Sequence, residues 1–422
     1  MQFAYIYLNV TSLLYSRLKS DKILKIKNKG RELTMQYSDS ILNTPSSFIR
    51  NILKVTDAED VISFAGGLPN PISFPIDALK ASVTHAIDES GAKLFQYSTT
   101  QGYLPLRQYI AEKYNTKQPG LDFKPEDVFI TTGSQQALEL ISKVLINKGD
   151  GIVIEEPGYL GAIQAFTLRE PTFHGVTLET EGINVDELKQ AVKQPNVKMV
   201  YTVPNFQNPT GLTYTKERRE EVYEAIKDED IIFIEDDPYG ELRFTGEHLP
   251  YIAAGKMKNS VVLGSFSKTV TPGMRLGYIL TKNHELLGHI ETAKQASDLH
   301  TNIFAQYVLY DYLANNDYDK HVEKIIALYK EQSNAMLAAM EKYFPPHVKY
   351  TKPEGGMFIW VTMEDGANAL EKFHEAMEQK VAFVPGNPFY TNKTEVNTMR
   401  LNYTNATPEV IEEGIKRLGE IL

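Results

Sequence analysis

The sequence predicts an α/β fold in which a mainly parallel sheet is flanked by helices, followed by a smaller α+β domain. Three observations support this fold class. Short, nearly continuous apolar runs alternate with helical patterns between residues 128 and 236, as is typical of parallel sheets covered on both faces. Most of these runs end in a loop rich in polar residues, glycine or proline. Beyond residue 280 helices dominate, and short strands return only from residue 355 on.

The predicted elements follow from these patterns in chain order. A capped helix is predicted at 46–53 and a short strand at 62–64, and helices are predicted at 75–90 and 103–114. A long helix beginning at Tyr318 is interpreted as a connector between domains. The other predicted elements are strands 128–131, 152–155, 172–177, 198–202, 231–234, 261–264, 355–360, 381–385 and 399–403, and helices 135–146, 185–192, 216–227, 367–378 and one from Pro408.

The domain organisation is predicted from length and from changes of pattern along the chain. The 422 residues allow two or three domains. Residues 1–34 are predicted to be a dispensable extension, because residues 17–31 are lysine-rich with little apolar pattern and Met35 begins a segment that resembles a normal start. Residues 35–74 are predicted to form an N-terminal arm and part of the small domain, 75–315 the large domain, and 316–422 the C-terminal small domain.

Composition excludes several classes of site. The chain contains no cysteine, which rules out disulfides, thiolate metal sites and thiol catalysis; no metal-ligand set is predicted. The net charge of −10 argues against nucleic acid as the main partner. No run of about 18 apolar residues indicates a membrane helix, and the first residues lack the pattern of a signal peptide. We therefore expect a cytoplasmic protein without a membrane partner.

The segment around Lys268 carries the first chemical signal. Lys268 follows a predicted buried strand and lies between hydroxyl residues, with Arg275 one loop further on. A lysine held neutral by its surroundings forms Schiff bases with carbonyl compounds. Ser265, Ser267 and Arg275 are suited to bind a phosphate beside it. By itself the segment is equally compatible with a solvated loop lysine and helix-capping serines.

Four further segments lie where predicted strands end. Gly133-Ser134-Gln135 begins a helix, where free N–H groups favour a phosphate. Tyr159 offers an aromatic face, and Asn208 lies in an Asn-Pro-Thr-Gly turn. Asp236 precedes Tyr239 by three residues. Because ligands bind beyond the carboxyl ends of parallel strands, we expect these side chains to converge with Lys268.

This set of motifs resembles the fold-type I, pyridoxal-phosphate-dependent aminotransferases of classes I and II. The resemblance runs from about residue 47 to the C-terminus, and the set formed by Asn-Pro-Thr-Gly, Asp-x-x-Tyr and Ser-x-x-Lys followed by Arg is specific. Within that family the chain is most similar to the 2-aminoadipate, kynurenine and aromatic aminotransferase branch. The segments that suggest this branch are 47–50 (Ser-Phe-Ile-Arg), 64–71 (Phe-Ala-Gly-Gly-Leu-Pro-Asn-Pro), 235–239 (Glu-Asp-Asp-Pro-Tyr) and 265–268 (Ser-Phe-Ser-Lys).

The resemblance implies a role for each matching residue. Lys268 would hold pyridoxal phosphate as an internal aldimine and then move the substrate's Cα proton, and Asp236 would pair with the pyridine nitrogen. Arg400 would bind the substrate α-carboxylate, with Gly67 donating a backbone N–H to the same group. The remaining cofactor contacts would be Asn208 and Tyr239 to the phenolic oxygen, Tyr159 stacked on the ring, and Ser134, Gln135, Ser265, Arg275 and, from the second subunit of a homodimer, Tyr97 to the phosphate.

The implied reaction is transfer of an amino group from an L-amino acid to a 2-oxo acid, with 2-oxoglutarate as the expected acceptor. The donor stays open among 2-aminoadipate, glutamate and aromatic amino acids. Arg50 matches a position that can meet a side-chain carboxylate, and an equal interpretation is a solvent-facing helix arginine. Two alternative functions remain: a pyridoxal-phosphate-dependent C–S β-lyase, and a non-enzymatic cofactor-binding regulator, which would need an N-terminal helix-turn-helix module that residues 1–46 do not resemble.

Overall fold

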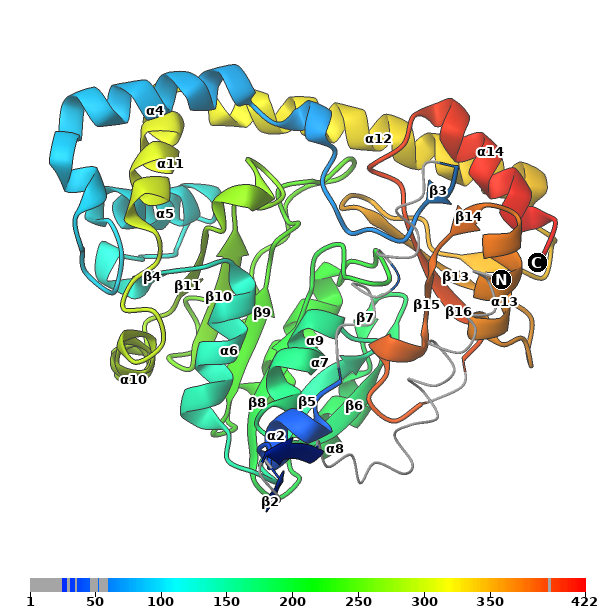
Figure 1. The fold of residues 1–422 in the computed structure, drawn as a ribbon, viewed down its shortest axis with the longest axis horizontal. Coiled ribbons are helices and arrows are strands. Elements are labelled where there is room, and N and C mark those ends of the chain that lie inside the picture. The colour runs from blue at the N-terminus through cyan, green and yellow to red at the C-terminus, as the bar shows by residue number, and fades with distance from the viewer. Residues whose placement is uncertain (1–24, 29–30, 35, 46–51, 53–59, 394–395) are drawn as a thin grey trace. The chain divides into compact units, whose positions relative to one another are not determined.

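The computed structural model describes residues 25–28, 31–34, 36–45, 52, 60–393 and 396–422 (Figure 1). The chain divides into two compact units, residues 1–44 and 45–422. In the first, β1 (Lys25–Asn28) pairs with β2 (Arg31–Thr34) as an antiparallel hairpin, and α2 (Asp39–Asn43) follows. The predicted helix at 46–53 and Arg50 lie outside the described residues, except for Ile52.

The large sheet of the second unit has eight strands and confirms the predicted mainly parallel α/β class. Its strand order is β4-β11-β10-β9-β8-β5-β6-β7, and β11 and β7 are antiparallel to their neighbours. Neither antiparallel strand was predicted from the sequence; β7 has only two residues. The strands are β4 (Val128–Thr131), β5 (Gly151–Glu156), β6 (Thr172–Glu179), β7 (Gly182–Ile183), β8 (Val197–Thr202), β9 (Ile232–Asp236), β10 (Ser260–Ser265) and β11 (Gly277–Leu280).

Helices cover both faces of this sheet because its strands are apolar on both sides. On one face, Met199 and Ile234 pack with α6, α7 and α10. On the other face, Val200 and Phe233 pack with α8 and α9, while Val262 and Leu280 pack with α5 and α11. The helices are α4 (Ile76–Ser90), α5 (Leu104–Lys117), α6 (Ser134–Leu145), α7 (Leu160–Thr167), α8 (Val185–Ala191), α9 (Lys216–Ile226), α10 (His284–Gln295) and α11 (Ile303–Asn315).

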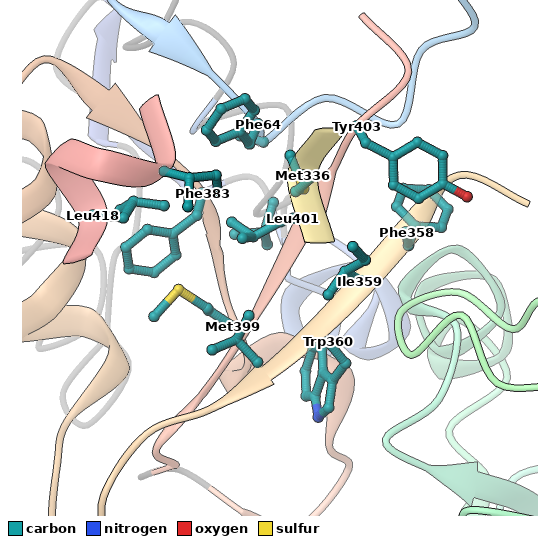
Figure 2. Packing of buried hydrophobic residues seen from close by; sticks show 14 of the residues in the cluster. Phe64, Met336, Phe358, Ile359, Trp360, Phe383, Met399, Leu401, Tyr403 and Leu418 are labelled. Atoms are coloured by element: carbon teal, nitrogen blue, oxygen red, sulfur yellow. The ribbon is translucent and has the colours of Figure 1, made fainter. Parts of the chain in front are cut away.

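A second core forms around a four-stranded sheet with the order β12-β13-β16-β15. Figure 2 shows Phe358, Ile359 and Trp360 of β13 beside Met399 and Leu401 of β16. Near it the parallel pair β3 and β14 joins the segment before α4 to the C-terminal part of the chain. The elements are β3 (Ile62–Ser63), β12 (Lys349–Tyr350), β13 (Phe358–Thr362), β14 (Val381–Ala382), β15 (Val384–Pro385), β16 (Thr398–Asn402), α13 (Ala369–Glu378) and α14 (Pro408–Gly419).

The long helix α12 (Tyr318–Tyr343) joins the two cores (Figure 1). Its first turns bury Tyr318 and Val322 in the core of the large sheet, and its later turns bury Met336 and Met340 in the second core. This is the arrangement expected of a connector. The predicted boundaries of the four segments 1–34, 35–74, 75–315 and 316–422 stay a prediction. Among the described helices, none is long and apolar enough to cross a membrane, and the compartment stays a prediction as well.

Candidate active site

The carboxyl ends of five parallel strands position the predicted site residues. Asp236 is the last residue of β9, and Ser265 is the last residue of β10, with Lys268 three residues further on. The loops after β4, β5 and β8 carry Ser134, Tyr159 and Asn208. Parallel strands aligned in one sheet bring their ends to one edge, so these segments from distant parts of the chain meet there.

Lys268 lies in a partly buried position with its amine aimed at the segment that follows β3. Its Nζ donates a hydrogen bond to the backbone carbonyl of Gly67 at 2.9 Å, and Nζ lies 5.9 Å from the centre of the Tyr239 ring. Burial, assisted by the positive charges of Arg400 and Arg275, lowers the pKa of Lys268 to about 8. Within the described part of the chain no carboxylate forms an ion pair with it. A substantial fraction of this amine is therefore neutral and nucleophilic near pH 8.

This lowered pKa can be measured in the cofactor-free protein. We expect the rate at which Lys268 is acetylated to rise with pH around a midpoint of about 8, rather than the usual lysine value of 10.5, because only the neutral amine reacts. The measurement is competitive labelling with acetic anhydride, quantified by mass spectrometry of the peptide that contains Lys268. Arg400→Ala removes the largest neighbouring positive charge and should move the midpoint upward. A midpoint near 10.5 in the unsubstituted protein would contradict the burial argument.

Asp236 presents one occupied and one free carboxylate oxygen. Its Oδ2 accepts a hydrogen bond from the Tyr201 hydroxyl at 2.7 Å, while Oδ1 is buried without a partner. Burial raises the pKa of Asp236 to about 7, and the Tyr201 hydrogen bond opposes that rise. A buried acceptor without a donor is costly unless a ligand supplies one. The site thus presents a free carboxylate oxygen for a cationic N–H.

Arg400 is the most deeply buried cation of the site. It lies on β16 at 1% exposure and donates from Nη1 to Asn208 Oδ1 at 2.9 Å and from Nη2 to the carbonyl of Ala65 at 2.8 Å. Its Nε has no hydrogen-bond partner. The guanidinium lies over the rings of Phe358 and Phe389, at 4.5 and 5.4 Å from their centres. Burial lowers the pKa of Arg400 to about 10, so it stays charged and suited to an anionic group.

The helix α6 begins at the phosphate segment predicted from the sequence. Gly133 adopts φ 75° before Ser134, the first helical residue. A Cβ at Gly133 would lie 2.7 Å from Nη2 of Arg275, so only glycine lets the guanidinium approach the helix terminus. Arg275 is solvent-exposed, and none of the ion pairs recorded among the described residues involves it. Arg275 Nη1 donates to the carbonyl of Pro272 at 3.3 Å, and its charge has no carboxylate partner among these ion pairs. This cradle of backbone N–H groups and an unneutralised guanidinium fits a phosphate.

The remaining predicted residues divide into those near this centre and those apart from it. Burial raises the pKa of Tyr159 to about 12, and the charge of Asp236 makes a smaller contribution to this rise. Tyr239 is buried, and its pKa is raised by burial, which a hydrogen bond with Asn208 opposes. Gln135 donates to the carbonyl of Gly161 at 2.8 Å. Tyr97, by contrast, is 79% exposed and meets the ring of His300 edge-on.

Sequence reasoning missed several residues that contact the predicted ones. Tyr201, Phe358, Phe389 and Ala65 were not singled out, although each touches Asp236 or Arg400. Tyr201 carried a usable signal: a tyrosine near the end of a largely buried strand needs a partner for its hydroxyl. The rings under Arg400 carried no such signal, because they have the pattern of ordinary core residues.

Comparisons with known proteins identify the family. The sequence model of the family "Aminotransferase class I and II" matches residues 70–418. The chain belongs to this family. It is a pyridoxal-phosphate-dependent aminotransferase of fold type I, in the branch that the motifs indicated.

Three relatives place this aminotransferase within its family. It is 42% identical to aromatic-amino-acid aminotransferase 1 of Thermococcus litoralis over 94% of this chain and 97% of that one. It is 38% identical to 2-aminoadipate transaminase of Thermus thermophilus over 89% and 94% of the two chains. It is also similar to Pyrococcus horikoshii kynurenine aminotransferase, whose crystal structure superposes with a TM-score of 0.86. The two sequences are 41% identical, and the match covers 91% of this chain and 96% of that one.

Proposed function

We propose that this aminotransferase moves the amino group of an aromatic amino acid, 2-aminoadipate or glutamate to 2-oxoglutarate. The observation that carries the proposal is the pairing of a partly neutral amine, Lys268, with a buried guanidinium, Arg400, whose Nε has no partner. An amino acid offers its carboxylate to Arg400 and its Cα proton to Lys268. The names of the relatives, which include aromatic-amino-acid and 2-aminoadipate enzymes, support this range of donors.

The residues present fit the cofactor at two independent points. The free Oδ1 of Asp236 would accept the N–H of the protonated pyridine ring, and the cradle at Gly133 and Arg275 would take the phosphate. Ser134, Gln135 and Ser265 would complete the phosphate contacts. Tyr159 would cover one face of the ring, and Asn208 and Tyr239 would reach its phenolic oxygen.

Each protein group then has a defined task. Bound pyridoxal phosphate supplies an electron-withdrawing ring that stabilises the negative charge left when the substrate Cα loses its proton. Lys268 Nζ removes that proton as general base and, once protonated, returns it as general acid. Arg400 binds the α-carboxylate through a planar fork that fixes its orientation. Gly67 would add a backbone N–H to the same carboxylate, while its carbonyl holds the Lys268 amine.

We also propose that the enzyme works as a homodimer in which Tyr97 reaches the phosphate of the neighbouring subunit. Large exposed apolar side chains support this, because monomers rarely present many of them together. Sedimentation velocity tests the proposal, and a monomer at working concentration would contradict it. Six of these side chains fall in two segments of the chain: Leu68, Ile72 and Ile76 in one, and Phe95, Tyr97 and Leu104 in the other.

The choice of donor depends on a residue outside the described part of the chain. Arg50 would meet a side-chain carboxylate if the resemblance holds there, which would favour 2-aminoadipate and glutamate. Aromatic donors would instead use apolar contacts. We therefore keep both donor classes in the proposal.

The experiment that tests the function is an absorbance spectrum of the cofactor-loaded protein before and after adding single amino acids. We expect the band of the lysine-bound cofactor to give way to a pyridoxamine-type band with phenylalanine, 2-aminoadipate and glutamate, and the rates to rank the donors. Phenethylamine, which lacks the carboxylate that Arg400 would bind, is the matched control and should react far more slowly. Pyruvate released from cystathionine without any 2-oxo acid would instead establish the lyase alternative.

A further inference from the structure

A second buried carboxylate, Glu155, lies near the site without touching any proposed ligand position. It belongs to β5 and is 0% exposed. Its Oε1 accepts the Tyr214 hydroxyl at 2.6 Å and the backbone N–H of Val203 at 3.1 Å, and its Oε2 accepts Nε2 of Gln207 at 3.0 Å. All three partners are donors, so the geometry calls for a group that only accepts, as an ionised carboxylate does.

Gln207 extends this contact to two loops at once. Its Nε2 also donates to the carbonyl of Pro157 at 2.8 Å, in the loop between β5 and α7. Its Oε1 accepts from the backbone N–H of Thr210 at 2.9 Å and from the Thr210 hydroxyl at 2.7 Å. The Gln207 amide therefore makes four hydrogen bonds, and all four are formed only when its Nε2 faces Glu155 and Pro157 and its Oε1 faces Thr210.

The two loops joined in this way carry two residues of the site. Tyr159 follows Pro157 by two positions, and Asn208 follows Gln207 directly. Asn208 in turn accepts from Arg400. We propose that Glu155, acting through Gln207, is a positioning residue that sets the placement of Asn208 and Tyr159 relative to the cofactor ring. This inference rests on the proposed roles of Asn208 and Tyr159.

Burial and the hydrogen bonds around Glu155 act on its pKa in opposite directions. Burial raises the pKa of Glu155 to about 7, and the hydrogen bonds from Tyr214, Gln207 and Val203 oppose that rise. Glu155 and Asp237 both act to raise the pKa of Asp236. A buried carboxylate is costly unless donors satisfy it, and an apolar side chain at this position would leave the three donors from Tyr214, Val203 and Gln207 without an acceptor.

Glu155→Gln is a sharp test because it keeps size and shape while changing one acceptor into a donor. The new NH₂ group would face either the Gln207 NH₂ group or the donors on the other side. If Gln207 flipped its amide to accept, its own NH₂ would face the N–H of Thr210 and its oxygen the carbonyl of Pro157. Neither orientation satisfies both loops, so Asn208 should lose its fixed placement.

The experiment compares the wild-type protein with Glu155→Gln, with the exchange variant Glu155→Gln/Gln207→Glu, and with Glu235→Gln as the matched control. Glu235 is also 0% exposed and lies on the same face of the sheet, but its oxygens accept from Ile252 and Ala253, away from both loops. Four quantities are measured: the pH midpoint of the lysine-bound cofactor's absorbance band, kcat and KM for one amino acid, and the Tm of the cofactor-free protein.

For Glu155→Gln we expect kcat/KM to fall on the order of 10-fold or more, because small displacements of positioned groups are costly. We also expect the pH midpoint of the absorbance band to rise by about half a pH unit to one pH unit. A displaced Asn208 would donate a weaker hydrogen bond to the phenolic oxygen, and its deprotonated form would be stabilised less. The exchange variant should recover part of kcat/KM and part of the shift in the midpoint. Its carboxylate at position 207 can accept from the new amide at position 155 and from Thr210. Glu235→Gln should change Tm without moving the midpoint.

Two results would overturn the inference: an unchanged midpoint and kcat in Glu155→Gln, or equal changes in Glu155→Gln and Glu235→Gln. Failure of the proposed function would look different. In that case the wild-type protein itself would show no lysine-bound band, or no conversion of that band by amino acids, before any variant is compared.

Discussion

Replacing Lys268 with alanine is expected to lower the rate of amino transfer by about 10⁴-fold, because one side chain serves both as cofactor anchor and as general base. The structure gives the physical reason for its reactivity: burial and two arginines lower the pKa of Lys268 to about 8. The Ala variant should still bind the cofactor through the phosphate cradle and Asp236, but without the absorbance band of a lysine-bound cofactor. Single-turnover kinetics followed by that spectrum measure both effects.

Lys268→Arg is the matched control for the loss of charge. It keeps a cation beside Gly67, but a guanidinium stays protonated and cannot act as a base. We expect the same loss of rate. A small primary amine added to the Ala variant should restore part of the rate, since it can enter the space left by the side chain and take the proton. It should not rescue the Arg variant. Wild-type turnover in Lys268→Ala would refute the assignment.

The second large effect is expected for Asp236→Asn, which should lower the rate of the half-reaction by about 10²- to 10⁴-fold. The carboxylate has one oxygen held by Tyr201 and one oxygen free for the ring nitrogen. Breaking a buried ion pair costs about 3–5 kcal/mol, and each 1.4 kcal/mol is a factor of about ten in rate. Stopped-flow absorbance with a single amino acid measures the rate.

Two controls separate charge from hydrogen bonding at this position. Tyr201→Phe removes one donor to Asp236 and leaves its charge, so we expect a smaller loss of about 10- to 100-fold, as for a hydrogen bond to a charged group. A cofactor analogue methylated on the ring nitrogen carries a permanent positive charge and should rescue part of the rate in Asp236→Asn. Wild-type rates in that variant would show that Asp236 does not pair with the ring.

The alternation of the parallel strands with helices along the chain could be predicted from the sequence, because it follows from local patterns. The helix predicted at 135–146 is observed as α6 (Ser134–Leu145), and the strand predicted at 198–202 as β8 (Val197–Thr202). Predictions were poorer for strands whose bounds depend on their partner strands rather than on a periodic pattern in the sequence. The segment predicted as one strand at 381–385 forms two strands, β14 and β15, which pair with different partners. The two-residue strands β7 and β12 are too short to have a period.

The sequence by itself determined the family and the chemistry of its motifs, since Lys268, Asp236 and Asn208 each lie in a short segment whose residue types already limit what it can do. The tertiary structure alone decided which groups meet. Arg400 binds Asn208 across 192 positions and Ala65 across 335, and Lys268 reaches Gly67 across 201. Such contacts depend on how two cores pack, which no local propensity encodes. The free oxygen of Asp236 and the donors around Glu155 arise from that packing.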